Sequence, residues 1–84
     1  MDKFYFIGID VSKKKLDICV MCDFKVLIEE QVTNSIKVVT QAIKHIKREL
    51  DITNDMFIIC AEHTGQYTYP LICATKVIDC KLWL

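Results

Sequence analysis

The chain has 84 residues, of which 52% are hydrophobic and 26% are charged, and its formal net charge is zero. A chain of this length forms at most one small domain, which buries only about 60 to 65% of the surface that the unfolded chain exposes. The composition excludes a disordered chain, no apolar run approaches the roughly 20 residues of a membrane span, and the zero charge argues against nucleic-acid binding by bulk electrostatics alone.

The first predicted element is an apolar strand over residues 4–9 that ends in a carboxylate, Asp10. Because apolar and polar residues do not alternate in it, the run is typical of a strand covered on both faces. A carboxylate at the end of such a strand must be solvated, paired or bound to a metal. Asp10 is therefore the first candidate site residue.

Two further strands follow the first one closely. After a lysine-rich turn at 13–15, residues 16–21 alternate between apolar and polar side chains with period two, as a half-buried strand does. A turn at 23–25 leads into a third strand over 26–32, whose end becomes polar. Three strands joined this tightly predict an antiparallel meander.

The period then changes to that of a helix. Apolar residues recur at steps of three and four along one stripe, at Ile36, Val39, Ile43, Ile46 and Leu50. Asn34 or Ser35 can cap the first turn of this helix. Its other face is basic, which favours a solvated face and leaves contact with phosphates as the alternative.

A second apolar strand, Met56–Ala61, also ends in a carboxylate, Glu62. A second helix follows, in which Tyr67, Leu71, Ala74 and Ile78 keep helical spacing. Because Pro70 is tolerated only in the first turn, we expect this helix to begin close to Glu62. Residues 81–84 begin a fifth strand, and we expect the domain to be truncated at its carboxyl end.

The order β-β-β-α-β-α-β predicts an α/β fold with a mixed sheet, because the crossover through the first helix places the fourth strand parallel to the first. If these two strands pair, Asp10 and Glu62 become neighbours at the carboxyl ends of the strands, where ligand sites of such sheets collect. Two adjacent carboxylates favour a hard divalent cation, Mg²⁺ with Mn²⁺ as a substitute, of the kind that assists phosphoryl displacement.

The amino terminus and the cysteines both indicate the cytoplasm. The chain passes directly into its first strand, without the segments of a secretory signal. Its five cysteines are an odd number and lie mostly among apolar neighbours, which favours reduced thiols over disulfides. Cys19 and Cys22 have C-x-x-C spacing, but residues three apart in a strand point to opposite faces, and no second pair completes a zinc site.

Two motifs resemble a known family. Gly8–Lys13, with Leu16 and Asp17 after it, and Glu62–Tyr67, with Pro70 and Leu71 after it, look like the two amino-terminal motifs of the DEDD transposases of bacterial insertion sequences. Those recombinases have a RuvC-like, ribonuclease H-fold catalytic domain. The resemblance implies that residues 1–84 are the amino-terminal part of such a domain.

In that family, the two matched carboxylates are the first of four acidic metal ligands in a nuclease-like site that cleaves and transfers DNA strands. The resemblance therefore implies catalytic and metal-binding roles for Asp10 and Glu62. The other two ligands, both aspartates, and a serine in a separate domain lie beyond residue 84, so we expect the chain to be inactive alone. The family's RNA-guided members also bind a structured RNA.

Other motif residues are candidates for nucleic-acid binding. Ser12 and Lys13 follow the first strand, and Lys13 is either a contact to the DNA backbone or an ordinary turn lysine. Thr64 and Gly65 either hold a phosphate at a helix terminus or simply cap the helix. Tyr67 either stacks near the site or belongs to the core, and its helical spacing favours the core.

Two other classes of function stay open. Actin-like ATPases and sugar kinases share the strand meander and a Gly-Ile-Asp beginning, but they need a glycine-rich phosphate turn, and residues 12–15 contain no glycine. A non-catalytic module for assembly or nucleic-acid docking is the other alternative. The apolar end at 82–84 predicts an exposed strand edge and therefore self-association.

Overall fold

The computed structural model describes residues 3–63 and 65–84 of the chain. The elements follow in the predicted order: β1 (Tyr5–Val11), β2 (Lys15–Cys22), β3 (Lys25–Thr33), α1 (Ile36–Leu50), β4 (Phe57–Ala61), α2 (Tyr69–Ile78) and β5 (Leu82–Trp83). Two short 3-10 helices, η1 (Asn54–Met56) and η2 (Gly65–Thr68), precede β4 and α2. The α/β fold class predicted from the sequence is confirmed.

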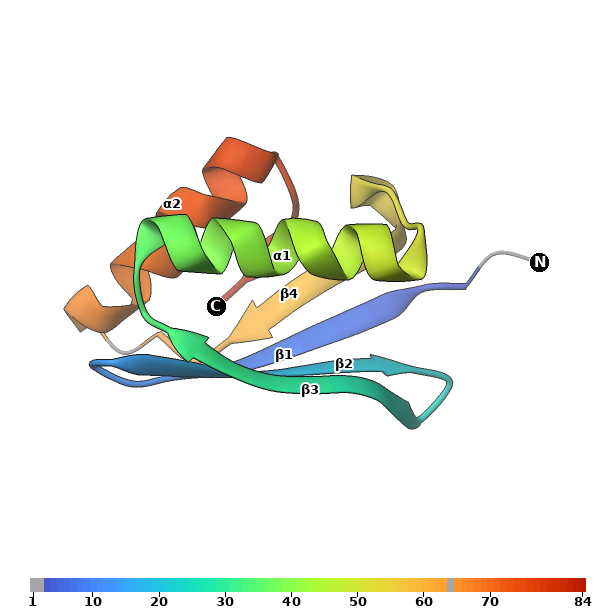
Figure 1. The fold of residues 1–84 in the computed structure, drawn as a ribbon, viewed down its shortest axis with the longest axis horizontal. Coiled ribbons are helices and arrows are strands. Elements are labelled where there is room, and N and C mark those ends of the chain that lie inside the picture. The colour runs from blue at the N-terminus through green and yellow to red at the C-terminus, as the bar shows by residue number, and fades with distance from the viewer. Residues whose placement is uncertain (1–2, 64) are drawn as a thin grey trace.

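The strands form one mixed sheet in the order β3-β2-β1-β4-β5 (Figure 1). The β1–β2 and β2–β3 pairs are antiparallel, which confirms the meander. The β1–β4 and β4–β5 pairs are parallel, because the chain crosses over through a helix before each returning strand. This topology places the carboxyl ends of β1 and β4 side by side at the same end of the sheet.

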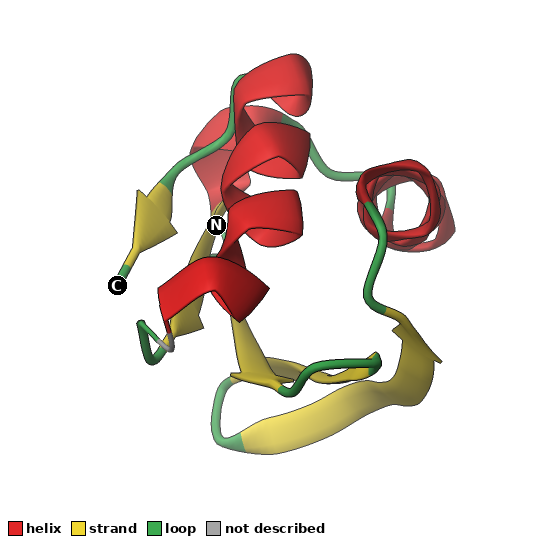
Figure 2. Ribbon diagram, turned by 90° about the vertical axis from the view of Figure 1, so that its left-hand side faces the viewer, coloured by secondary structure: helices red, strands yellow, loops and turns green. Residues whose placement is uncertain are grey.

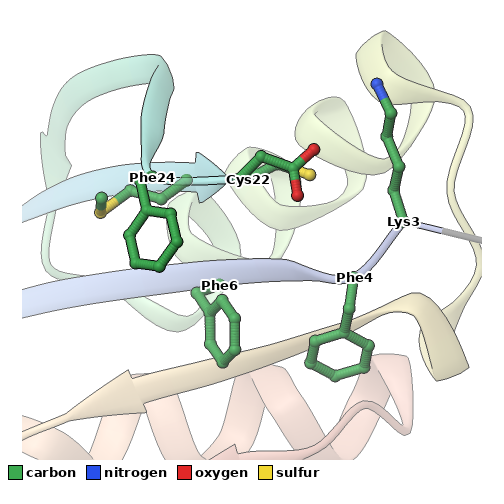
Figure 3. Close-up of a pocket in the computed structure, with 7 residues that line it drawn as sticks. Lys3, Phe4, Phe6, Cys22 and Phe24 are labelled. Carbon is green, nitrogen blue, oxygen red and sulfur yellow. The ribbon is translucent and has the colours of Figure 1, made fainter.

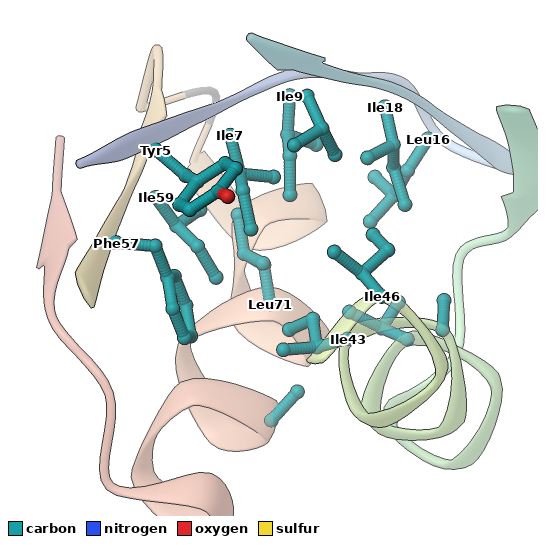
Figure 4. Packing of buried hydrophobic residues seen from close by; sticks show 14 of the residues in the cluster. Tyr5, Ile7, Ile9, Leu16, Ile18, Ile43, Ile46, Phe57, Ile59 and Leu71 are labelled. Atoms are coloured by element: carbon teal, nitrogen blue, oxygen red, sulfur yellow. The ribbon is translucent and has the colours of Figure 1, made fainter. Parts of the chain in front are cut away.

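Both α-helices lie on the same face of the sheet and pack against each other (Figures 1 and 2). The core fills the space between this face and the helices (Figure 4). Its main side chains are Ile7, Ile9, Leu16, Ile18, Ile43, Ile46, Phe57, Ile59 and Leu71. We call the opposite side of the sheet the open face, because in the described part of the chain no helix lies on it.

The prediction that the first strand is covered on both faces is wrong for the described residues. β1 alternates strictly between buried and exposed residues, with Ile7 and Ile9 in the core and Phe6 and Asp10 on the open face. The apolar run misled the interpretation because its outward residues, such as Phe4, are also apolar. An unusually apolar open face therefore needs its own explanation.

The helix starts differ in how well they were predicted. Ser35 caps α1, since its hydroxyl accepts a hydrogen bond from the Val38 backbone nitrogen at 3.2 Å. The second helix was expected to begin close to Glu62, but α2 begins at Tyr69, after η2. The backbone of Gly65 is left-handed, with φ of +66°, so a right-handed helix cannot run through it. Pro70 lies in the first turn, as predicted.

The cysteines are all free thiols. Cys22 is buried on the helix side, whereas Cys19 is half-buried on the open face, so the C-x-x-C pair is split as expected for a strand. None of the helices in the described ranges is long and apolar enough to cross a membrane.

Candidate functional site

The pairing of β1 with β4 brings the two predicted site carboxylates to the same end of one parallel ladder. Ile9 and Ala61 form the last pair of this parallel ladder; Asp10 is the next residue on β1, and Glu62 directly follows the end of β4. Both side chains are exposed. The strand pairing on which the predicted site depends is therefore present, and both carboxylates are accessible at the carboxyl ends of their strands.

A third carboxylate, Asp17, lies beside Asp10 on β2, the neighbour of β1 on the side away from β4. The two residues are direct partners in the antiparallel β1–β2 ladder, and both are exposed on the open face. Gln31, the partner of Asp17 on β3, donates a hydrogen bond from Nε2 to Asp17 Oδ1 at 2.9 Å. Like charges directly opposite in a ladder are unfavourable, so a cation at this end of the sheet would be favoured there.

The hydrogen bond from Gln31 gives the Asp17 carboxylate a polar partner on the open face. Its position beside Asp10 was missed, although the period-two pattern of the hairpin contains the signal. Within residues 3–63 and 65–84, no group of three or more histidine, cysteine, aspartate or glutamate side chains is placed to hold a metal ion. The described acidic side chains therefore form at most part of a coordination shell.

Ser12 forms hydrogen bonds within the turn between β1 and β2. Its backbone nitrogen donates to the Lys15 carbonyl at 3.0 Å, and its hydroxyl donates to the same carbonyl at 2.8 Å. The hydroxyl also accepts a hydrogen bond from the Lys15 backbone nitrogen at 3.3 Å. Lys13 is exposed in the same turn. Of the two residues predicted to contact nucleic acid here, Ser12 therefore uses its polar groups within the turn, and Lys13 is exposed.

The second motif places its residues around η2. Gly65 opens this 3-10 helix, and a Cβ at that position would meet nothing within 4 Å, so the left-handed backbone is the reason for glycine there. A 3-10 helix, not the expected α-helix, begins at Gly65, and the prediction for Thr64 lies outside the described residues. Tyr67 packs against the core, which agrees with its helical spacing. His63 is exposed.

Asn34 connects the two motif loops, which sequence reasoning did not predict. Its Nδ2 donates to the Ser12 carbonyl at 2.8 Å and to the Tyr67 carbonyl at 2.9 Å, and its backbone nitrogen donates to the Lys14 carbonyl at 2.8 Å. The Asn34 side chain therefore links, by hydrogen bonds, the loop after Asp10 to the segment that follows Glu62. The two side-chain partners lie 22 and 33 residues away, so no local pattern could have revealed them.

The sheet topology and the helix placement define a small α/β domain of the ribonuclease H-like and actin-like class. No protein-family model matches the sequence, and no curated protein matches it. Solved structures do match. A protein of Bacteroides thetaiotaomicron, described as having an actin-like ATPase fold and unknown function, is 12% identical with a TM-score of 0.74 over 100% of this chain and 34% of its own.

The RuvC structure of Thermus thermophilus is 11% identical, with a TM-score of 0.65 over 95% of this chain and 62% of its own. The same protein in complex with a Holliday junction substrate is 12% identical, with a TM-score of 0.61 and the same coverage. Identities this low show the fold alone. The chain spans about a third of the length of the actin-like protein and less than two thirds of the length of RuvC.

Proposed function

We propose that this chain is part of a RuvC-like, metal-dependent nuclease domain, and specifically of a DEDD transposase or recombinase of the insertion-sequence kind. The observation that carries the proposal is the parallel pairing of β1 with β4, whose last pair, Ile9 and Ala61, directly precedes Asp10 and Glu62. The two sequence motifs around these residues supply the specific assignment. The fold-level likeness to RuvC supports nuclease chemistry, and the Holliday junction bound to RuvC supports DNA as the partner.

The donor set fits a hard divalent cation. Asp10 and Glu62 offer exposed carboxylate oxygens, the ligands that Mg²⁺ and Mn²⁺ prefer. When bound, such a cation stabilises the charge that develops on the oxygens of a phosphodiester during its cleavage. In this proposal, Asp10 and Glu62 hold the cation, and Asn34 keeps their two loops together. Further ligands come from outside residues 1–84, so the chain by itself is inactive.

Contacts to the nucleic acid are part of the same proposal. Lys13 contacts a phosphate from the exposed turn beside Asp10, while Ser12 supports that turn. Thr64, Gly65 and Tyr67 contribute from the loop after Glu62. We include a structured guide RNA among the partners, by analogy with the RNA-guided members of the family that the motifs resemble. The five free thiols suit the reducing cytoplasm.

The test is a Mn²⁺ titration of the isotope-labelled chain, in which the paramagnetic ion broadens amide signals near its site. We expect selective broadening at Asp10 and Glu62 that disappears in Asp10→Asn. Asp51→Asn is the matched control, because Asp51 is exposed beyond α1 with a left-handed backbone that asparagine tolerates. Uniform broadening, or broadening that survives Asp10→Asn, would count against a cation held by this pair.

An actin-like ATPase is the second candidate, favoured by the TM-score of 0.74 to a protein described as having that fold. The turn after Asp10 argues against it, because it lacks glycine and its Ser12 groups bond within the turn. A thermal shift with ATP and Mg²⁺ that exceeds the shift with Mg²⁺ alone would favour the ATPase. Salt-sensitive DNA binding without any Mn²⁺ site would instead favour a docking module without chemistry.

A further inference from the structure

The open face carries an apolar surface at the end opposite the carboxylates. We call this set the aromatic surface: Phe4, Phe6, Met21 and Phe24. Phe6 and Met21 are ladder partners on β1 and β2, and the rings of Phe4 and Phe6 meet edge to face with centroids 5.4 Å apart. Figure 3 shows the three phenylalanine rings projecting to the same side. With Lys3, Cys22 and Asp23, these residues line a cavity of about 530 Å³.

The exposure of these rings is large for a chain of this size. Phe4, Phe6 and Phe24 are 42%, 52% and 100% exposed. With about 200 Å² for each phenylalanine, the three rings present roughly 400 Å² of apolar surface to water. A patch of this size lies within the range of about 300–600 Å² of the largest apolar patch on a typical monomer, which is often functional. Two such surfaces in contact would bury roughly 800 Å² from the rings alone, close to the lower limit of about 1,000 Å² for a specific interface.

Charge complementarity favours a second copy of this chain as the occupant. Lys3 and Asp23 line the same cavity, so a two-fold contact can place Lys3 of one copy against Asp23 of the other, twice. The formal net charge is zero, so two copies do not repel each other at long range. A nucleic acid stacking on the rings would instead meet the carboxylate of Asp23, with Asp10 and Asp17 further along the same face.

The acidic end of the open face determines how two copies can overlap. If the open faces overlapped completely, Asp10 and Asp17 would lie against either the other copy's carboxylates or its aromatic rings. The first arrangement is repulsive, and the second removes charges from water without a partner. The contact is therefore restricted to the aromatic end. Strand addition at the β3 edge is disfavoured by Glu29 and Glu30 and by the irregular register between β2 and β3.

We propose that two copies of this chain associate through the aromatic surface about a two-fold axis, with their acidic ends left open. The interface is small, so the dimer forms in a concentration-dependent manner. This inference uses none of the residues proposed to bind metal or nucleic acid, so its failure would leave the proposed metal site untouched.

Sedimentation equilibrium of the 84-residue chain across a concentration series tests the proposal. We expect the mass to rise from 9.8 kDa toward twice that value. Phe24→Asn should abolish this rise. The variant should still fold, because the ring is fully exposed and the backbone of Phe24, at φ of 64°, is left-handed, a conformation that asparagine tolerates. Val77→Gln, on the exposed side of α2, is the control and should still dimerise.

Trp83→Ser separates this interface from self-association at the β5 edge. We expect it to leave the dimer unchanged, because Trp83 lies on the edge strand β5 and does not line the aromatic cavity. A chain that stays at monomer mass at every concentration would overturn the proposal. So would a dimer that survives Phe24→Asn, or one that Trp83→Ser abolishes and Phe24→Asn does not.

Discussion

Asn34→Ala tests whether the link between the two motif loops matters beyond general stability. The substitution removes two hydrogen bonds, from Nδ2 to the carbonyls of Ser12 and Tyr67. At a net contribution of about 0.5–1.5 kcal/mol each, they stabilise the fold by about 1–3 kcal/mol. The Oδ1 atom is buried without a hydrogen-bond partner, so its removal offsets part of that loss. We expect the free energy of unfolding to fall by about 1–2 kcal/mol in urea denaturation.

Asn54→Ala is the matched control for this experiment. Asn54 likewise donates two hydrogen bonds from Nδ2, to the carbonyls of Ile78 and Asp79, and its Oδ1 is also buried without a partner. Its loss should cost a similar free energy. However, it joins η1, which precedes the start of β4, to the end of α2, whereas Glu62 follows the other end of β4. The Mn²⁺ broadening should therefore weaken in Asn34→Ala and persist in Asn54→Ala. Equal effects of the two variants on broadening would refute the positioning role of Asn34.

Three further predictions follow from single side chains. Ser35→Ala should lower the free energy of unfolding by about 1 kcal/mol, measured in urea, because the Val38 nitrogen loses its cap; an unchanged midpoint would contradict this role. Burial raises the pKa of the Cys80 thiol above its ordinary value. The protonated thiol therefore contributes to the free energy of unfolding at pH values below the ordinary thiol pKa, and this contribution is lost as the pH rises through the raised pKa of the folded state. Cys80 should therefore alkylate slowly in a mass-spectrometric time course, and fastest labelling there would contradict the burial. Gly8→Ala should leave the free energy of unfolding unchanged or increase it by up to about 1 kcal/mol. The reason is that the nearest atom to an added Cβ is the Cys19 carbonyl oxygen, at 3.9 Å. A clear loss of stability in urea denaturation would show that the fold itself needs glycine there.

The elements that could be predicted from the sequence are those with a strong local period. The alternation over 16–21 and the stripe from Ile36 to Leu50 each match an observed element, because burial on one side imposes the period directly. The start of α2 could not be predicted in the same way. It depends on the left-handed backbone of Gly65 and on a 3-10 turn, and neither leaves a periodic pattern.

The candidate site could be predicted only in part, for a related reason. The adjacency of Asp10 and Glu62 depends on the pairing of β1 with β4, which follows from the order of elements. Asn34 acts through carbonyl groups, and a carbonyl belongs to every residue type, so its partners leave no trace in the sequence. Links of this kind become visible only when the loops are placed in space.

The open face divides into two chemically distinct ends, and Gly8 lies between them on β1. Toward the start of the strand, Phe6 pairs with Met21, and toward its end, Asp10 pairs with Asp17. An exposed strand position without a side chain weakens the strand, and the space above Gly8 would accept a methyl group. The described fold therefore does not itself require glycine at this position.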